Sequence, residues 1–446
     1  MSFPYRYLLL ITIFSLLLGA GKAEAQDSLH ISLQEARRLA FENNTNIRNS
    51  TLDMEIARKK IWETTAIGLP HVDSKAAYQF LPNVPTLPPG TMGPGTPAVE
   101  LGVKNNATFD VTASQLLFNG SYLVGLKAMK TLYQQTNENT EKIVQDVNES
   151  VINTYYMILV GEESLKNLQK NLDNVKKTQY EITEMNKQGF VEKTDVDQLE
   201  LTANNLKNAM NQVKGNLDVA NRLLKIILGL DVNKNVVLTE SLTAGHTLPS
   251  VVNSLVNESF NIDKNIDYRI IKTATTLSKL EYQNAIAAYM PVISGFYSHT
   301  EKINKPAFDF TVKDVLGINL SLPIFSSGQR MAVVSQKKLA ISKMDNTKQL
   351  VYNNLMMQAD QFQIDLKLKY EKYEIQEKSL ALSDEIYQRT LEKYKNGVSS
   401  SMDLTTTQNQ YLTSLSNYYQ SIYDLVIAKT KLEKLYNINQ EINKKQ

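Results

Sequence analysis

The sequence repeats itself at an offset of 208 residues, and this repeat constrains the fold more than any other feature. Gly189 corresponds to Gly397, and Asp195 corresponds to Asp403. Three further pairs obey the same offset: Gly120 and Gly328, Leu224 and Leu432, and Ile227 and Leu435. A period of this length indicates that a unit of about 200 residues was duplicated. We therefore expect two similar halves in one body: a first repeat at 26–230, an equatorial inter-repeat segment at 231–262, a second repeat at 263–438 and a C-terminal tail at 439–446.

Proline is absent between Pro97 and Pro249 and after Pro323, so long helices are permitted there. The stretches 120–187 and 328–395 each have 68 residues, and as helices they would extend about 100 Å. The returning stretches carry apolar residues at steps of three and four, which is typical of a left-handed coiled coil. The sequence therefore predicts a long antiparallel helical hairpin in each half, at 120–229 and 328–437, with turns at Gly189 and Gly397. Shorter helices are expected before each β-segment, at 33–44, 47–66 and 268–289.

Other segments alternate apolar and polar residues with a period of two, which indicates strands with one apolar and one polar face. This pattern is clear at 72–80, 103–114 and 312–322, whereas 292–300 alternates poorly and is assigned by its place in the repeat. Each half thus offers one β-hairpin, at 70–118 and 291–325, which makes four strands per chain. The stretch 81–97 holds six of the twelve prolines and is expected to be a long irregular loop.

The N-terminus has the pattern of a cleavable export signal. Arg6 precedes an apolar run at 8–18, and Ala23-Glu24-Ala25 then provides a small-x-small cleavage pattern, so we expect a signal peptide at 1–25. The alternative is an N-terminal membrane anchor, but the run is short for about 30 Å of hydrocarbon. The chain has no cysteine, which excludes disulfides and thiolate metal sites. A net charge of +2 gives no reason to expect nucleic acid as a partner.

Strands that face lipid must close into a barrel, and four strands fall short of the smallest membrane barrels, which have about eight. Three copies would supply twelve strands and a ring of helices beneath them. The predicted fold class is therefore a mixed membrane α+β protein: a trimeric twelve-stranded β-barrel continued by a long antiparallel coiled-coil α-helical barrel, with an internal twofold repeat.

Several short motifs occur in a fixed order along nearly the whole mature chain. They are Ser32-Leu-Gln-Glu-Ala-Arg-Arg-Leu-Ala-Phe-Glu-Asn-Asn44, Pro70 and Pro291, Phe118-Asn-Gly120, Leu228-Gly-Leu230, Pro323-Ile-Phe-Ser-Ser-Gly328, and Tyr394-Lys-Asn-Gly397 with Asp403 and Gln408. In this order the chain resembles outer membrane efflux proteins of the TolC family. The resemblance implies a homotrimer in outer-membrane lipid, with a periplasmic helical tunnel that meets an inner-membrane pump, proton-driven or ATP-driven, through a periplasmic adaptor protein. It implies no cofactor, no metal and no catalysis.

The resemblance also implies a gate at the helix tips. Tyr394 matches a tyrosine that ties the closed helices to an aspartate, and Asp195 matches that aspartate. Ser399 stands where the family has an arginine, so the charge-assisted part of the tie is missing. Asp403 matches the first of two constriction aspartates and Thr406 replaces the second. A single ring of three carboxylates would attract cations and hinder anions.

Simpler interpretations exist for the same residues. Asp195 and Asp403 are also suited to helix capping, and Tyr394 continues the seven-residue series Tyr373, Leu380 and Tyr387 of a packed seam. Five phenylalanines are candidates either for interfacial girdles or for packing at strand ends: Phe80, Phe109, Phe118, Phe296 and Phe325.

Two rival functions follow from the same sequence. An enzyme is disfavoured because the four histidines, His30, His71, His246 and His299, are scattered and no catalytic motif is present. A periplasmic coiled-coil scaffold or adaptor without a barrel would explain the long helices, but it would not explain four strands placed symmetrically between them.

Overall fold

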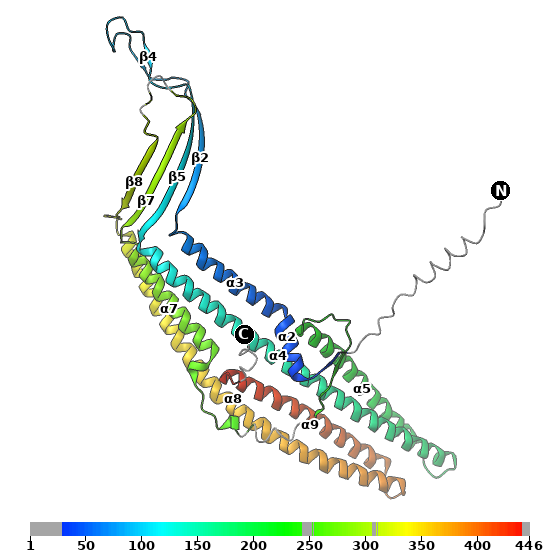
Figure 1. Ribbon diagram of the computed structural model, residues 1–446. Helices are drawn as coiled ribbons and strands as arrows, with labels where there is room; N and C mark the ends of the chain where they lie inside the picture. Colours follow the sequence, from blue (N-terminus) through cyan, green and yellow to red (C-terminus); the bar gives the residue numbers. More distant parts are fainter. Residues whose placement is uncertain (1–28, 243–251, 253, 306–308, 310, 439–446) are drawn as a thin grey trace, which may run out of the picture.

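The computed structural model describes residues 29–242, 252, 254–305, 309 and 311–438. The expected signal peptide, the C-terminal tail and His246 lie outside these residues. The molecule is long and curved, with a β-sheet at one end and helices that run from it to the other end (Figure 1).

Four antiparallel strands form the sheet, as expected. They are β2 (His71–Phe80), β5 (Asn105–Asn119), β7 (Val292–Lys302) and β8 (Asp314–Ser321), in the order β2-β5-β7-β8. The two predicted hairpins therefore lie side by side and meet where β5 pairs with β7. Within the described residues, β2 and β8 each have a partner on one side only, so the sheet has two open edges.

The two faces of the sheet differ in polarity. One row across all four strands contains Val72, Ala113, Tyr297 and Leu316, and Val72 and Leu316 are 70% and 84% exposed. On the opposite face Thr112 and Ser298 share a hydrogen bond of 3.0 Å between their hydroxyls. Directly opposed residues share a face in an antiparallel sheet, so the register shows which face each residue of β7 occupies although its own sequence alternates poorly.

The loop after β2 differs from the expected irregular loop. It contains a short antiparallel pair, β3 (Thr86–Leu87) and β4 (Val99–Glu100), which extends beyond the sheet (Figure 1). The pairing involves only two residues on each strand, too few to leave a periodic signal in the sequence.

Four helices continue the strands in the same lateral order. They are α3 (Thr45–Ala66), α4 (Gly120–Lys187), α7 (Ile266–Ala287) and α8 (Gln329–Lys395). Each packs against the next: α3 on α4, α4 on α7, and α7 on α8. The helix α4 has the bounds predicted from the proline-free stretch, and α8 begins one residue later because Gly328 is its N-cap, with φ of 80°.

Further from the sheet, α5 (Lys193–Ile227) returns along α4, and α9 (Ser401–Tyr436) returns along α8. The two hairpins pack together mainly through α4 and α9. Apolar side chains from all four helices form one buried cluster near the tips: Leu168, Leu172, Val175, Ile182, Leu199, Leu206, Met210, Tyr387, Tyr394 and Leu404. The predicted seam residues thus lie in the core between the hairpins.

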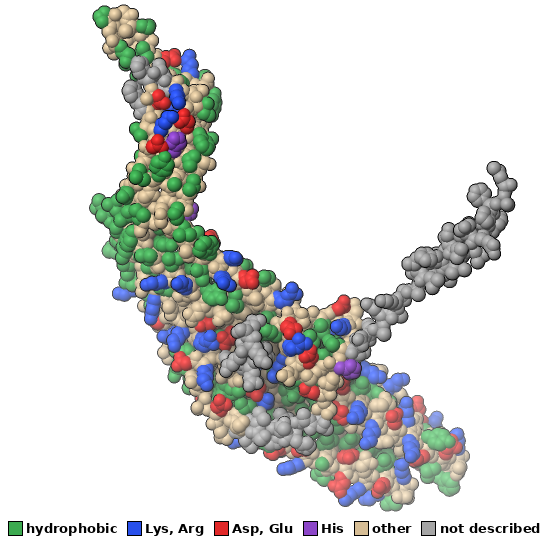
Figure 2. Space-filling model, in the orientation of Figure 1, with side chains coloured by type: hydrophobic (Ala, Val, Ile, Leu, Met, Phe, Trp, Pro, Cys, Tyr) green, Lys and Arg blue, Asp and Glu red, His purple; other side chains and the backbone are tan. Residues whose placement is uncertain are grey.

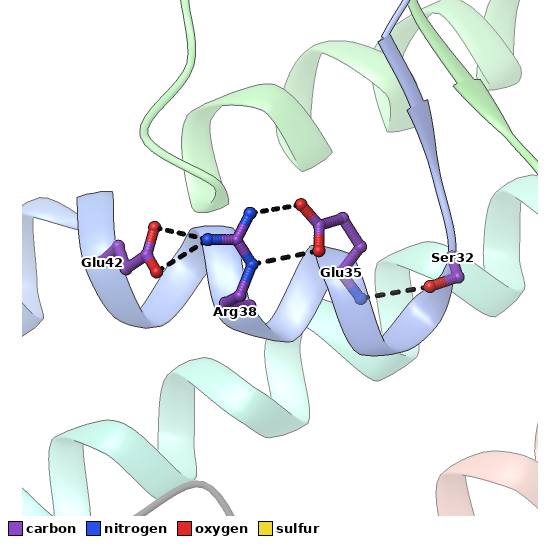
Figure 3. A network of polar contacts seen from close by, with 4 residues as sticks. All are labelled: Ser32, Glu35, Arg38 and Glu42. Atoms are coloured by element: carbon purple, nitrogen blue, oxygen red, sulfur yellow. Dashed lines mark hydrogen bonds and ion pairs between the residues drawn. The ribbon is translucent and has the colours of Figure 1, made fainter. Parts of the chain in front are cut away.

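The middle of the molecule contains a strand pair that the sequence did not predict, beside a helix that it did. β1 (Leu29–Ile31) pairs in parallel with β6 (Val236–Leu238), and Ile31 is fully buried. Next to them α2 (Leu33–Asn43) begins at Ser32, whose hydroxyl accepts a hydrogen bond from the Glu35 backbone amide. On its surface Arg38 donates to both Glu35 and Glu42 (Figure 3). Because these pairs are exposed to water, they contribute little to stability.

Two asparagines join helices end to end at this level. Asn44 is the N-cap of α3, and its Nδ2 donates to the Ile227 carbonyl at the end of α5 over 2.7 Å. Asn265 is the N-cap of α7, and its Nδ2 donates to the Leu435 carbonyl in the last turn of α9 over 2.9 Å. Each side chain therefore caps the start of one helix and the end of another, so α5 continues into α3 and α9 into α7.

Among the described residues no helix is both long enough and apolar enough to cross a bilayer.

Candidate functional site

The two hairpin tips lie at the end of the molecule furthest from the sheet (Figure 1). Gly189 and Gly397 turn the chain with φ of 80° and 72°, in the left-handed region that favours glycine, and both have open space where a Cβ would stand. The predicted turn positions are therefore confirmed.

Tyr394 is packed between the hairpins. It is 7% exposed and belongs to the buried cluster near the tips, which supports its interpretation as a seam residue. Its hydroxyl oxygen is buried and has no hydrogen-bond partner among the described residues. Burial, and secondly the Asp195 carboxylate, raise the pKa of the Tyr394 phenol to about 12. The fold therefore brings Tyr394 and Asp195 within electrostatic reach, without the hydrogen bond that the resemblance implied.

Asp403 caps the helix α9. The Ser400 hydroxyl accepts from the Asp403 amide over 3.1 Å, while Asp403 Oδ2 accepts from the Ser400 amide over 3.2 Å, which completes a capping box. The Ser400 and Ser399 hydroxyls also donate to Oδ2, over 2.8 and 3.2 Å. These hydrogen bonds, that of the Ser400 side chain first, lower the pKa of the exposed Asp403 carboxyl below its usual 3.8. Thr406 lies one turn further along α9 and is also exposed.

The first-half tip is built differently. Asp195 lies half-buried in the first turn of α5, whose N-cap Glu192 makes no side-chain capping hydrogen bond. The capping interpretation therefore describes Asp403, but the structure has no equivalent box at Asp195. Ser399, which the resemblance aligns with an arginine, contacts Asp403 of its own hairpin.

One contact between the hairpins was missed by sequence reasoning. Lys395 Nζ on α8 lies 3.4 Å from Glu181 Oε2 on α4, one residue after the buried Tyr394. Both side chains are about 40% exposed, at 38% and 40%. A pair of surface charges from opposite halves of a chain leaves no pattern in the sequence, so only the packing of the two hairpins against each other brings them together.

A second feature is the exposed apolar surface beside the last strand. Six residues of β8 and the turn before α8 are 54–92% exposed, and we call them the apolar belt: Leu316, Ile318, Leu320, Leu322, Ile324 and Phe325.

The proposed phenylalanine girdles need one correction. Phe296 pairs with Ser114 on the polar face, where its ring covers Gly317, because the strand register places it opposite to the belt.

No group of histidine and acidic side chains suited to a metal ion occurs in the described part of the chain.

The chain was compared with known proteins. The family profile described as outer membrane efflux protein matches residues 36–230 and 281–437. A search of curated protein sequences finds no match.

Solved structures share the fold. CusC, whose structures concern folding and transmembrane channel formation, is 16% identical over 94% of this chain and 95% of that chain, with a TM-score of 0.74. The CmeC outer membrane channel of Campylobacter jejuni is 18% identical over 91% and 85%, with a TM-score of 0.72. The open state of the MtrE outer membrane channel of Neisseria gonorrhoeae is 17% identical over 91% and 88%, with a TM-score of 0.69.

Proposed function

Because this chain belongs to the outer membrane efflux protein family, we propose that three copies of it form a channel that carries exported substrates across the periplasm and the outer membrane. In this channel the three sheets close into one twelve-stranded barrel, and the helices form a tunnel below it. The role is transport without catalysis.

The observation that carries the proposal is the sheet itself. It exposes an apolar face and has two open edges, β2 and β8, within the described chain. Open edges are not tolerated in hydrocarbon, whereas pairing β8 of one copy with β2 of the next removes all of them. The belt residues of β8 and just beyond it, from Leu316 to Leu322, extend about 20 Å along the strand, close to the apolar band of about 25 Å in known membrane barrels.

The helices present matching open edges. One edge is α8, which exposes apolar side chains at heptad spacing: Leu350, Met357, Ile364, Leu368, Ile375 and Leu382. The other edge is α3 next to the sheet and α5 further away, where Ile56, Val219 and Ile226 are 53%, 66% and 61% exposed. Such stripes are seams without a partner helix, and a neighbouring copy supplies that partner.

The internal repeat is part of the proposal. Ile227 and Leu435 are related by the offset of 208 residues, and each accepts a hydrogen bond from an N-cap asparagine, Asn44 or Asn265. This shared chemistry supports a duplication, and it supports a tunnel wall in which the two halves alternate around the axis.

The gate lies at the hairpin tips, where Asp403, Tyr394, Asp195, Ser399 and Thr406 gather around the turns at Gly189 and Gly397. Three Asp403 carboxylates form an acidic ring, held in place by the capping box and favouring cations. The buried Tyr394 hydroxyl lacks an acceptor among the described residues, at a cost of about 1–3 kcal/mol. Asp195, whose carboxylate already acts on Tyr394 electrostatically, is the proposed acceptor when the tips tighten in the trimer. The Lys395–Glu181 pair then supplies the charged link that Ser399 does not.

The proposed partners are a periplasmic adaptor protein and an inner-membrane pump, and the proposed location is the outer membrane with a large periplasmic part, after export by a cleavable signal. The scaffold alternative is not favoured by the family. A scaffold would leave membranes after a carbonate wash, whereas the channel should require detergent and should then run as a trimer in native mass spectrometry. A monomer recovered in the wash without detergent would refute the proposal.

The gate is tested separately from the channel. Replacing Ser399 with Arg should lower channel opening in planar bilayers, because we propose that Asp195 lies opposite this position in the closed trimer and would pair with the new guanidinium. The conservative variant Ser399→Thr is the control. An unchanged opening probability for Ser399→Arg would count against this geometry while leaving the trimeric channel in place.

A further inference from the structure

Positive charge is concentrated where the helices meet the sheet. The twelve helical residues nearest the sheet in α3, α4, α7 and α8 cover about 18 Å of each helix. Together these forty-eight residues carry nine basic and three acidic side chains, a net charge of +6, whereas the whole chain carries +2. We call the nine the basic collar: Arg58, Lys59, Lys60, Lys127, Lys130, Lys279, Arg330, Lys337 and Lys338. No single helix contributes more than three of them, so the full set gathers only in the folded chain.

Most of the collar is exposed in the single chain. Seven of its side chains are exposed, and Arg330 and Lys337 are half-buried. Within the described residues only Lys337 forms an ion pair, with Glu281 over 2.7 Å. The other eight cationic side chains form no ion pair with any described residue of the chain.

The collar adjoins the apolar belt. Figure 2 shows green side chains over the lower part of the sheet and, directly below them on the same face, Lys and Arg side chains across the adjoining helices. An apolar surface bordered by cations matches the boundary between acyl chains and phosphate headgroups.

The only tryptophan of the chain lies in the same zone. Trp62 is 64% exposed and stands four residues before the end of α3, about 6 Å along the helix axis. Exposed tryptophan is enriched at membrane interfaces, because its ring is apolar and its N–H is polar. Trp62 is therefore a second, independent indication that this zone meets headgroups.

We propose that the basic collar binds the phosphate groups of anionic phospholipids in the leaflet on the helical side of the membrane. This inference rests on the proposed channel, since it requires the sheet to be in a bilayer. The collar fixes the depth of the channel in the membrane and gives it a preference for anionic over zwitterionic lipid.

The fluorescence of Trp62 tests this preference. The full chain, purified in detergent, is reconstituted in bilayers of phosphatidylcholine mixed with phosphatidylglycerol, and one or the other lipid carries brominated chains that quench tryptophan. We expect phosphatidylglycerol to be preferred around Trp62 by about fivefold, the factor that one basic side chain contributes near an anionic surface. The preference should decrease as salt screens the phosphates.

Two variants identify the source of the preference. In the first variant, Arg58, Lys59 and Lys60 are all replaced with Gln. The ratio of phosphatidylglycerol to phosphatidylcholine around Trp62 should then fall close to one, because three exposed cations next to Trp62 are removed. The matched control replaces Lys170, Lys176 and Lys177 with Gln on the distant part of α4, where the side chains are also exposed, and should leave it unchanged.

The outcomes separate the two proposals. Equal quenching by both lipids in the native protein, or an undiminished preference in the collar variant, would overturn the collar and leave the channel standing. Absence of quenching by either lipid would place Trp62 away from the acyl chains and would also overturn the collar, whereas the channel is tested by its need for detergent and its trimeric mass.

Discussion

The double role of Asn265 gives the sharpest prediction. Its Oδ1 accepts from the Tyr268 amide at the start of α7, and its Nδ2 donates to the Leu435 carbonyl of α9. Asn265→Asp keeps the first interaction, since Asp is an equally good N-cap, and removes the second. The substitution therefore breaks the junction between α9 and α7 without uncapping α7.

The magnitude follows from burial. Asn265 is 2% exposed, so the Leu435 carbonyl loses its donor in a place that water does not reach easily. An unsatisfied buried polar group costs about 1–3 kcal/mol. The new carboxylate gains about 0.3–1 kcal/mol at the N-terminus of α7 but meets the negative end of the α9 dipole, so these two effects largely cancel. We expect local opening of the junction to become easier by about 1–3 kcal/mol.

Amide hydrogen exchange measures this opening where it occurs. A change of about 1–3 kcal/mol accelerates exchange about 5- to 150-fold in the last turn of α9 and the first turn of α7. The matched control is Asn261→Asp, because Asn261 caps the short helix η2 (Ile262–Lys264), is exposed and donates to no other helix in the described structure. Equal exchange at both helix ends in the native protein and in Asn265→Asp would refute the idea that this asparagine joins the two helices.

Three other predictions concern the turns and the gate. Asp403→Ala should reduce cation preference in planar bilayers while trimers persist, because it removes the proposed ring of carboxylates. Unchanged selectivity would remove Asp403 from the pore. Gly229→Ala should lower the free energy of unfolding by several kcal/mol, since φ is 66° and the new Cβ would lie 2.3 Å from a backbone oxygen. Gly397→Ala, in open space, should lower it by only about 1 kcal/mol. Equal losses of unfolding free energy for the two variants in denaturant would contradict the clash at Gly229. Lys395→Glu should increase channel opening, because it turns the ion pair with Glu181 into a repulsion. Adding Glu181→Lys should restore the pair with reversed charges and bring opening back to the native level. Failure of the double variant to restore closure would exclude this pair as a link between the hairpins.

The sequence by itself determined the elements and their order. The absence of proline and the apolar steps of three and four are local signals, so the bounds of α4 and the turns at Gly189 and Gly397 were predictable from the chain. The same holds for the two β-hairpins, because alternation reports which face of a strand is apolar. The segment 292–300 alternates too weakly to be recognised as a strand from its own residues. Its position in the second repeat identified it as the strand that is now β7.

The tertiary structure decided which distant segments meet. The pairing of β5 with β7, the parallel pair of β1 and β6, and the end-to-end helix junctions all join residues more than 150 positions apart. The Lys395–Glu181 pair and the basic collar arise in the same way, since each gathers charges from helices that are separate in sequence. Periodicity describes one segment relative to its own axis, whereas neighbours are selected by the packing of complete elements, and for that reason these contacts appear only in the folded chain.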